Sequence, residues 1–193
     1  MRSIYLFPAS AVLVLVLNYS LFAQKNKEKE DATIVPEMPV NADTKLITYT
    51  EVVLCDGTQQ ELYDKALAWY KKFYKNPTDV IRKQDPENGM IQGIARYKIF
   101  NKHKKGVDTD AGNVSYTILV YVKDKRYKYE LTKFNWLQTS SIPIEKWQDK
   151  SSKLYSVQYE QYLIQTDAYA KDLIEKLKNH MGSNPVEDNK DKW

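Results

Sequence analysis

Residues 114–136 read VSYTILVYVKDKRYKYELTKFNW, and this stretch decides the fold of the chain. The run from Val114 to Lys123 is rich in β-branched and aromatic residues, which favour a strand. Asp124-Lys125 forms a tight turn, after which Tyr127 to Trp136 returns as a partner strand. Apolar and polar residues alternate in both runs, as expected where one face of a sheet is buried and the other is open. The expected core face holds Tyr116, Ile118, Val120, Val122, Tyr127, Tyr129 and Leu131.

Three further strands are predicted upstream of this hairpin. They cover residues 45–54, 79–84 and 90–100, and the last of them follows the turn sequence DPENG. Gly93 lies inside this third run and indicates a bulge or a close backbone approach. Residues 103–113 are predicted as a polar loop and residues 138–156 as irregular structure.

Two helices complete the prediction. Thr58 and Glu61 form a capping-box pattern that starts a helix ending near Tyr74. An apolar stripe at helical spacing runs along this helix and holds Leu62, Ala66, Trp69, Tyr70 and Phe73. A second helix is expected over residues 157–181, ended by Gly182. The order β-α-β-β-β-β-α predicts an α+β fold, a two-layer α/β sandwich. Its five-stranded, mostly antiparallel sheet carries two helices on one face.

The chain is expected to hold one folded domain between polar segments. Residues 1–23 have the charged, apolar and small-residue order of a secretory signal peptide. Their apolar run is shorter than the ~20 residues that span a bilayer, so we expect cleavage and no membrane span afterwards. Residues 24–42 are expected to form a flexible linker, residues 43–181 the domain and residues 182–193 a disordered tail. Export to the periplasm or the medium follows from the leader.

Composition narrows the possible partners. Removing the leader takes away one charged residue, Arg2, and lowers the formal net charge from +4 to +3. So small an excess does not favour nucleic-acid binding. Cys55 is the only cysteine, which excludes an intramolecular disulfide and a cysteine-clustered metal site. We interpret it as a small apolar core residue, although a lone exported thiol is a possible reactive group.

One acidic segment resembles a calcium loop. Residues 108–113, DTDAGN, alternate acids as such loops do. An EF-hand needs an oxygen donor at the fifth position, a glycine at the sixth and a glutamate at the twelfth. Counted from Asp108, these positions are Gly112, Asn113 and Leu119. The preferred interpretation is therefore a polar connection between strands.

No other pattern assigns a catalytic group. His103 in a loop and His180 at the end of the last helix form a joint site only if the fold brings them together. The chain has no glycine-rich phosphate loop and no nucleophile elbow. We therefore assign no catalytic, cofactor-binding or metal-binding residue, expect no cofactor, and predict that the protein is not an enzyme.

The predicted open sheet face is the main candidate surface. One interpretation is a nucleic-acid face, because Arg96, Tyr97, Lys98, Phe100, Lys125, Arg126, Tyr127, Lys128 and Tyr129 interleave aromatic and basic side chains. The preferred interpretation divides them between a core face and a polar face. A patch for a protein or glycan partner remains possible on the open face. It is expected to hold Thr48, Thr50, Thr117, Leu119, Tyr121, Thr132, Phe134 and Trp136.

Several segments together resemble one protein family. They are the leader ending in Phe22-Ala23-Gln24, LITYTEVV, QELYDKALAWYKKFY, VIRKQDPENGMIQGIARY and IPIEKWQ. Over roughly Asp43 to Lys146 the chain resembles an exported domain of unknown function with a TBP-like fold, common in Bacteroidetes bacteria. The resemblance implies a β-α-β4-α order and transfers no catalytic residues. The name of the fold describes a shape and implies no DNA binding.

These observations lead to a ranked expectation of function. We expect an uncharacterised exported protein, a non-enzymatic module of the cell envelope or the medium that binds an envelope protein or another surface component. A small-molecule or glycan binder is the alternative, and a hydrolase ranks third. A small-molecule binder should show a deep, mostly apolar cavity. An interaction module should show an exposed aromatic patch, and an enzyme should gather titratable groups with shifted pKa values.

Overall fold

A computed structural model describes residues 34–103 and 106–182 and contains one antiparallel sheet. The strands are β1 (Tyr49–Leu54), β2 (Ile81–Asp85), β3 (Met90–Asn101), β4 (Thr109–Lys123), β5 (Arg126–Leu137) and β6 (Ser141–Pro143). Their spatial order is β1-β5-β4-β3-β2, and the short β6 pairs with β5. The pairs β3–β4 and β4–β5 are the longest, so the stretch quoted first forms the centre of the sheet.

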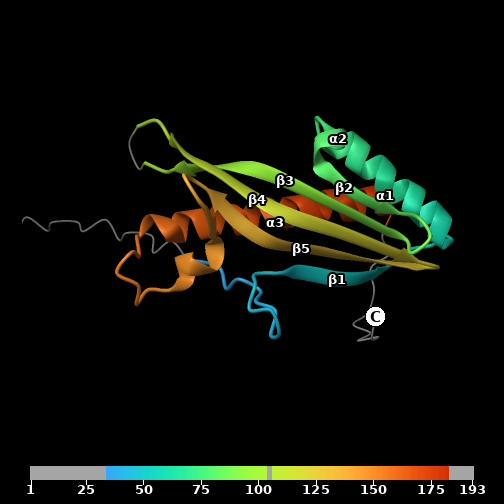
Figure 1. Ribbon diagram of the computed structural model, residues 1–193, viewed down its shortest axis with the longest axis horizontal. Helices are drawn as coiled ribbons and strands as arrows, with labels where there is room; N and C mark the ends of the chain where they lie inside the picture. Colours follow the sequence, from blue (N-terminus) through green and yellow to red (C-terminus); the bar gives the residue numbers. More distant parts are fainter. Residues whose placement is uncertain (1–33, 104–105, 183–193) are drawn as a thin grey trace, which may run out of the picture. The chain divides into compact units, whose positions relative to one another are not determined.

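Two long helices, α1 (Gln59–Phe73) and α3 (Gln158–Met181), lie behind the sheet on one face (Figure 1). A helical turn, α2 (Pro77–Val80), and a 3₁₀ turn, η1 (Ile144–Gln148), are added to the predicted elements. The predicted α+β class, the antiparallel sheet and the placement of both helices on one face are confirmed.

Local chemistry sets the ends of both helices. The backbone N–H of Thr58 donates to the Glu61 carboxylate at 2.8 Å, and the N–H of Glu61 donates to the Thr58 hydroxyl at 3.3 Å. This is the predicted capping box, which satisfies two amides that have no partner inside the helix. At the other end of the chain, Gly182 adopts φ 73°, and its N–H donates to the carbonyl of Lys178. Glycine suits this left-handed C-terminal position.

Aromatic residues fill the space between the sheet and the helices. Trp69 and Tyr70 of α1 are buried, and the Tyr70 hydroxyl donates to the carbonyl of Ile118 at 3.1 Å. Tyr97 of β3 stacks on Tyr169 of α3 with ring centroids 4.0 Å apart. Trp69, Tyr70 and Tyr169 lie on the apolar sides that the helical spacing predicts for α1 and α3, so this pattern identified the core side of both helices correctly.

Three boundaries differ from the predictions. The first strand begins at Tyr49 instead of residue 45, because Lys45 adopts φ 59° in a turn. Pro77 starts a helical turn where a strand was predicted from residue 79, so β2 begins at Ile81. The predicted loop over residues 103–113 is shorter, since β4 already begins at Thr109 and pairs with the end of β3.

The segment predicted as irregular, residues 138–156, contains part of the core. It forms β6 and η1, which bury Ile144 and Trp147. Trp147 packs against Trp136 and Tyr162 with ring centroids 5.8 and 5.4 Å away. The sequence did not predict that this segment contributes to the core. Around Pro143 the segment is polar and too short to show either a strand period or a helical period.

The folded unit extends into the predicted linker. Met38 is 4% exposed, and Val40 forms an isolated bridge with Ile47. Residues 38–42 therefore pack with the domain, since a flexible linker would not bury a methionine. The predicted signal peptide, the first part of the linker up to residue 33, and tail residues 183–193 lie outside the described residues.

Candidate functional site

The two acidic side chains of the calcium-like segment, residues 108–113, form ion pairs with lysines. Asp108 pairs with Lys102, and Asp110 pairs with Lys98 at 2.7 Å. Asp110 also accepts the N–H of Gly112 at 2.7 Å. Hydrogen bonds from these lysines are the main reason that the pKa of each carboxyl lies below its usual range. Within residues 34–103 and 106–182, no group of three or more His, Cys, Asp or Glu side chains could hold a metal ion.

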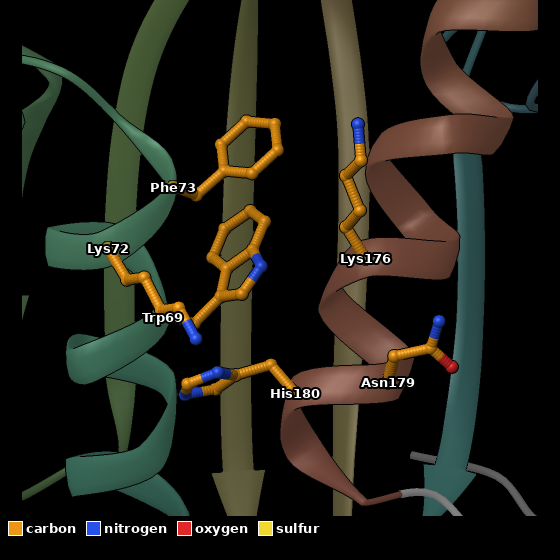
Figure 2. Close-up of a pocket in the computed structure, with 6 residues that line it drawn as sticks. All are labelled: Trp69, Lys72, Phe73, Lys176, Asn179 and His180. Atoms are coloured by element: carbon orange, nitrogen blue, oxygen red, sulfur yellow. The ribbon is translucent and has the colours of Figure 1, made fainter.

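The fold does not bring the two histidines together. The β3–β4 loop, which carries His103, lies at one end of the sheet, and the C-terminal end of α3 lies at the other (Figure 1). The Nε2 atom of His103 is 3.5 Å from the Thr109 hydroxyl. His180 instead faces α1 (Figure 2). A shared catalytic or metal-binding role for the pair is therefore not supported.

Cys55 lies in the core. It is 3% exposed, and its Sγ lies 3.0 Å from the carbonyl oxygen of Met181, to which the thiol donates. Burial raises the pKa of the Cys55 thiol, which disfavours the reactive thiolate. The interpretation as a core residue agrees with this position at the junction of β1 and α3.

Two aromatic residues predicted on the open face lie on the core side. Thr132 pairs with Thr117 and Asn135 pairs with Ser115, so β5 carries one extra residue between these pairs. Lys133 adopts φ 55° at this bulge. A bulge turns the following side chains to the other face. Phe134 is consequently fully buried, and the Trp136 indole N–H donates to the carbonyl of Ala111 at 2.9 Å.

What remains of the open face is rich in threonine. The hydroxyls of Thr48 and Thr132 lie 2.9 Å apart, and these residues and Thr117 are largely buried. Tyr121 is half-buried, with Lys128 Nζ 5.8 Å from its ring centroid. This face therefore lacks the exposed aromatic patch expected of a binding surface, at least among the described side chains.

The structure also lacks the exposed aromatic surface that the nucleic-acid interpretation requires, at least among the described tyrosines of that set. Tyr97, Tyr127 and Tyr129 are each at most 8% exposed and lie on the core face. Bases need an accessible aromatic face for stacking. The basic residues between these tyrosines therefore belong to the polar face, as the preferred interpretation states.

The clearest candidate site is a groove between α1 and α3, which we call the helix groove. It is defined by Trp69, Lys72, Phe73, Lys176, Asn179 and His180 and has a volume of about 700 Å³. Figure 2 shows the side chains of Trp69, Phe73 and His180 between the two helices, with Lys72 on α1 and with Lys176 and Asn179 on α3. The C-terminal halves of both helices supply the lining, so residues more than 100 positions apart meet here.

The helix groove combines an aromatic floor with a cationic rim. Trp69 is 2% exposed and stacks on Phe73 with ring centroids 4.9 Å apart. Lys176 Nζ lies 6.0 Å from the centroid of the Phe73 ring and pairs with Asp172 at 2.6 Å. Figure 2 shows the indole nitrogen of Trp69 on the side facing α3. No carboxylate of residues 34–103 or 106–182 lines the groove, so the described lining offers hydrogen-bond donors and positive charge to an occupant.

Part of this site was visible in the sequence. Trp69 and Phe73 were placed on the apolar stripe of the first helix, and His180 was recognised near the end of the last helix. Lys176 and His180 are four residues apart, which puts them on one side of a helix. Nothing local indicates that this side faces α1, so the groove could be recognised only after folding.

Buried tyrosines form a separate network. The Tyr116 hydroxyl lies 3.0 Å from that of Tyr74 and 2.9 Å from that of Tyr169. Burial is the main cause that raises the pKa of each of these three tyrosines. Because their partners are other neutral hydroxyls, the network holds the helices on the sheet and has no group suited to accept a proton at neutral pH.

The helices of the described part of the chain include none with the length and apolar character needed to cross a membrane.

Known proteins resemble the chain mainly in fold. A DUF4468 family protein from Bacteroides ovatus has 19% identity and a TM-score of 0.60, covering 80% of this chain and 94% of its own. A TBP-like protein from Parabacteroides distasonis has 13% identity and a TM-score of 0.56, covering 71% and 93%. No curated protein matches. Residues 49–136 match the family described as a domain of unknown function (DUF4468) with TBP-like fold. Over residues 49–136 the chain is therefore similar to the DUF4468 family, and it shares the TBP-like fold of these solved structures, which confirms the resemblance seen in its sequence.

Proposed function

We propose that this protein is an exported, non-enzymatic binding module of the cell envelope or the medium, and that it binds another protein. The observation that carries this proposal is the helix groove, in which the half-buried ring of Phe73 is accessible to a partner, stacks on buried Trp69 and lies between Lys72 and Lys176. Aromatic side chains in desolvated depressions supply much of the binding energy of protein interfaces. The partner occupies the groove with an acidic surface.

The charges of the groove support an acidic partner. Lysines are positively charged at neutral pH, and the part of the lining that the structure describes contains two of them and no carboxylate. The pair between Lys176 and Asp172 leaves both side chains more than half exposed, so it competes only weakly with a partner. Charges at the edge of an interface mainly raise the association rate and select the partner.

The proposed export rests on the leader. Arg2, the apolar run that follows and the small residues before Gln24 have the order of a secretory signal. Periplasm and medium are equally compatible with it. The proposed non-enzymatic role is supported by the lining of the groove, in which His180 has no serine, threonine, cysteine or carboxylate beside it as a nucleophile among the residues that the structure describes.

A small-molecule or glycan binder is the second candidate. The volume of about 700 Å³ falls within the range of ligand-binding sites, roughly 300–1,000 Å³. A carboxylated ligand would suit the same lysines. A hydrolase ranks below both candidates.

The test separates the two binding candidates. A photoreactive amino acid replaces Asn179 in the groove or, as a control, the exposed Lys153 of the loop before α3, and cells are irradiated. We expect a discrete protein adduct from position 179 alone. Lys72→Glu should abolish it, whereas Lys71→Glu should not, because Lys71 has the same charge on the same helical turn but does not line the groove.

Two results would contradict the proposal. Equal adducts from both positions, or equal effects of both charge reversals, would remove the groove as the binding site. A small molecule retained by the parent in native mass spectrometry and lost from Lys72→Glu, without any protein adduct, would establish the second candidate instead.

A further inference from the structure

One edge of the sheet is only partly covered. β3 has twelve residues, but its outer neighbour β2 pairs only with Met90 to Gly93. The chain before β2 turns away into α2, so the rest of this edge has no neighbouring strand among the described residues. Figure 1 shows β3 running past β2 along the border of the sheet.

The side-chain amide of Gln165 bonds to one position of this edge in the way that the backbone of an added strand would. The N–H of Phe100 donates to Gln165 Oε1 at 3.0 Å, and Gln165 Nε2 donates to the carbonyl of Phe100 at 2.9 Å. Both backbone groups of Phe100 therefore point away from β4. The β3–β4 register shifts between Ile99 and Phe100 but is continuous from Met90 to Ile99, and just before β3 the N–H of Val122 donates to the carbonyl of Gly89 at 2.7 Å. Because the directions alternate along a strand, the odd-numbered residues up to Ile99 bond to β4, and the backbone groups of Arg96 and Lys98 point away from it. No hydrogen bond joins them there to another described residue.

A basic hollow lies beside the uncovered positions. It has a volume of about 530 Å³, and its lining includes Val80 and Arg82 on one side and Ala95 and Arg96 of β3 on the other. Lys75 adds a third cation, whereas Asp79 is the only acid in the lining. An added strand would have room in this hollow and would be favoured by negative side chains.

We propose that the edge of β3 from Ile94 to Lys98 accepts an extended acidic segment of a partner protein by strand addition. The backbone groups of Arg96 and Lys98 supply the ladder, as in other cases where a peptide extends an exposed sheet edge. Ile94 is 41% exposed and offers an apolar contact beside them. This site is separate from the helix groove and does not depend on the function proposed for it.

Charge argues against a second copy of the chain as the occupant. Two β3 edges paired about a two-fold axis near Tyr97 would place Arg96 opposite Lys98, which is unfavourable between strands even though Lys98 also pairs with Asp110 at 2.7 Å. The competing explanation is that these cations protect the edge from any pairing, as lysines often do on edge strands. That explanation predicts no binding, so the same experiment decides between them.

The first measurement is amide hydrogen exchange in the mature protein. Arg96 and Lys98 amides should exchange rapidly, while the amides of Ala95 and Tyr97, which face β4, should be protected. The second is an NMR titration with an acetylated and amidated peptide of alternating Glu and Val. We expect shifts centred on Arg96 and Lys98 and slower exchange of their amides. A Lys-Val peptide should bind at least about tenfold more weakly.

Two variants of the experiment test whether backbone hydrogen bonds carry the binding. A Glu-Val peptide with N-methyl groups on alternate amides keeps its charge but cannot form the ladder, and should lose about tenfold or more in affinity. Arg96→Pro should act likewise, because its N–H is outside the β4 ladder and proline is tolerated on such an edge. Arg96→Ala, which keeps the N–H, should weaken binding less. The N-methyl peptide decides the question even if Arg96→Pro does not fold.

The proposal is overturned if Arg96 and Lys98 are protected in the free protein, or if no shifts appear at the edge. It is also overturned if the N-methyl peptide binds as well as its parent. Concentration-dependent protection of the edge, with dimers in sedimentation, would replace the peptide with a second copy of the chain.

Discussion

Gly93 gives the sharpest test of how α1 packs on the sheet. A Cβ atom at this position would lie 2.8 Å from Cε1 of Tyr70, 3.1 Å from Val80 and 3.2 Å from Ile118. The shortest of these distances is below normal contact. Tyr70 cannot easily retreat, because its ring is fully buried and its hydroxyl is bonded to the carbonyl of Ile118. Gly93→Ala should therefore force α1 and the sheet apart locally.

The expected loss in free energy of unfolding is the difference between two opposing effects. Overpacking a close-packed core by one methyl group costs about 1–3 kcal/mol. Replacing glycine makes the unfolded chain less flexible, which offsets about 0.4–1 kcal/mol where the backbone angles suit alanine. We expect Gly93→Ala to lower the free energy of unfolding by about 1–2 kcal/mol. Urea unfolding followed by tryptophan fluorescence and circular dichroism measures this change, with the slope of the transition unchanged.

A double-mutant cycle identifies the cause. Tyr70→Leu removes the ring atom nearest to the new methyl group, although it destabilises the protein by itself. In that background Gly93→Ala should be close to neutral, giving a coupling energy of about 1 kcal/mol or more. The packing described for β3 and α1 would be refuted if Gly93→Ala lowered the free energy of unfolding equally in the parent and in the Tyr70→Leu background. It would also be refuted if Gly93→Ala had no effect in the parent.

Three further predictions concern the first helix and the tyrosines. Trp69→Ala should lower the free energy of unfolding by about 3–5 kcal/mol, because the indole is buried at the floor of the groove between α1 and α3; a variant that unfolds in urea like the parent would show that the apolar stripe of α1 does not pack there. Thr58→Ala should cost about 1 kcal/mol by removing the helix cap, whereas Thr58→Ser should be nearly neutral in the same assay. Burial raises the pKa values of Tyr70 and Tyr116, so above about pH 10 tyrosines ionise first in the unfolded chain and stability falls as pH rises. Tyrosinate absorbance should then rise together with the loss of circular dichroism, and gradual ionisation in the intact fold would contradict this.

The elements themselves were predictable because their signals are local. The capping box at Thr58, the alternation in β4 and β5, and Gly182 at the end of α3 each express a preference of a few neighbouring residues. The close approach at Gly93 was also indicated by glycine inside a strand pattern. What could not be inferred was that the ring at this point belongs to Tyr70.

The errors have a common physical origin. Lys133 is an ordinary residue in an alternating run, yet the bulge there turns Phe134 from the predicted open face into the core. Ile144 and Trp147 were missed because a turn too short for a period can still be buried by long-range contacts. In both cases the packing of distant side chains outweighed the local pattern.

The sequence by itself therefore determined the fold class, the two-sided sheet and the core faces of α1, α3 and β4, since hydrophobic periodicity is a property of neighbouring positions in the sequence. Tertiary structure alone decided the candidate sites. The helix groove exists because Trp69 and Lys176 meet across more than 100 residues, and the uncovered edge exists because β2 is much shorter than β3. Such surfaces depend on which elements become neighbours and how far each extends, and these are properties of the packed chain as a whole.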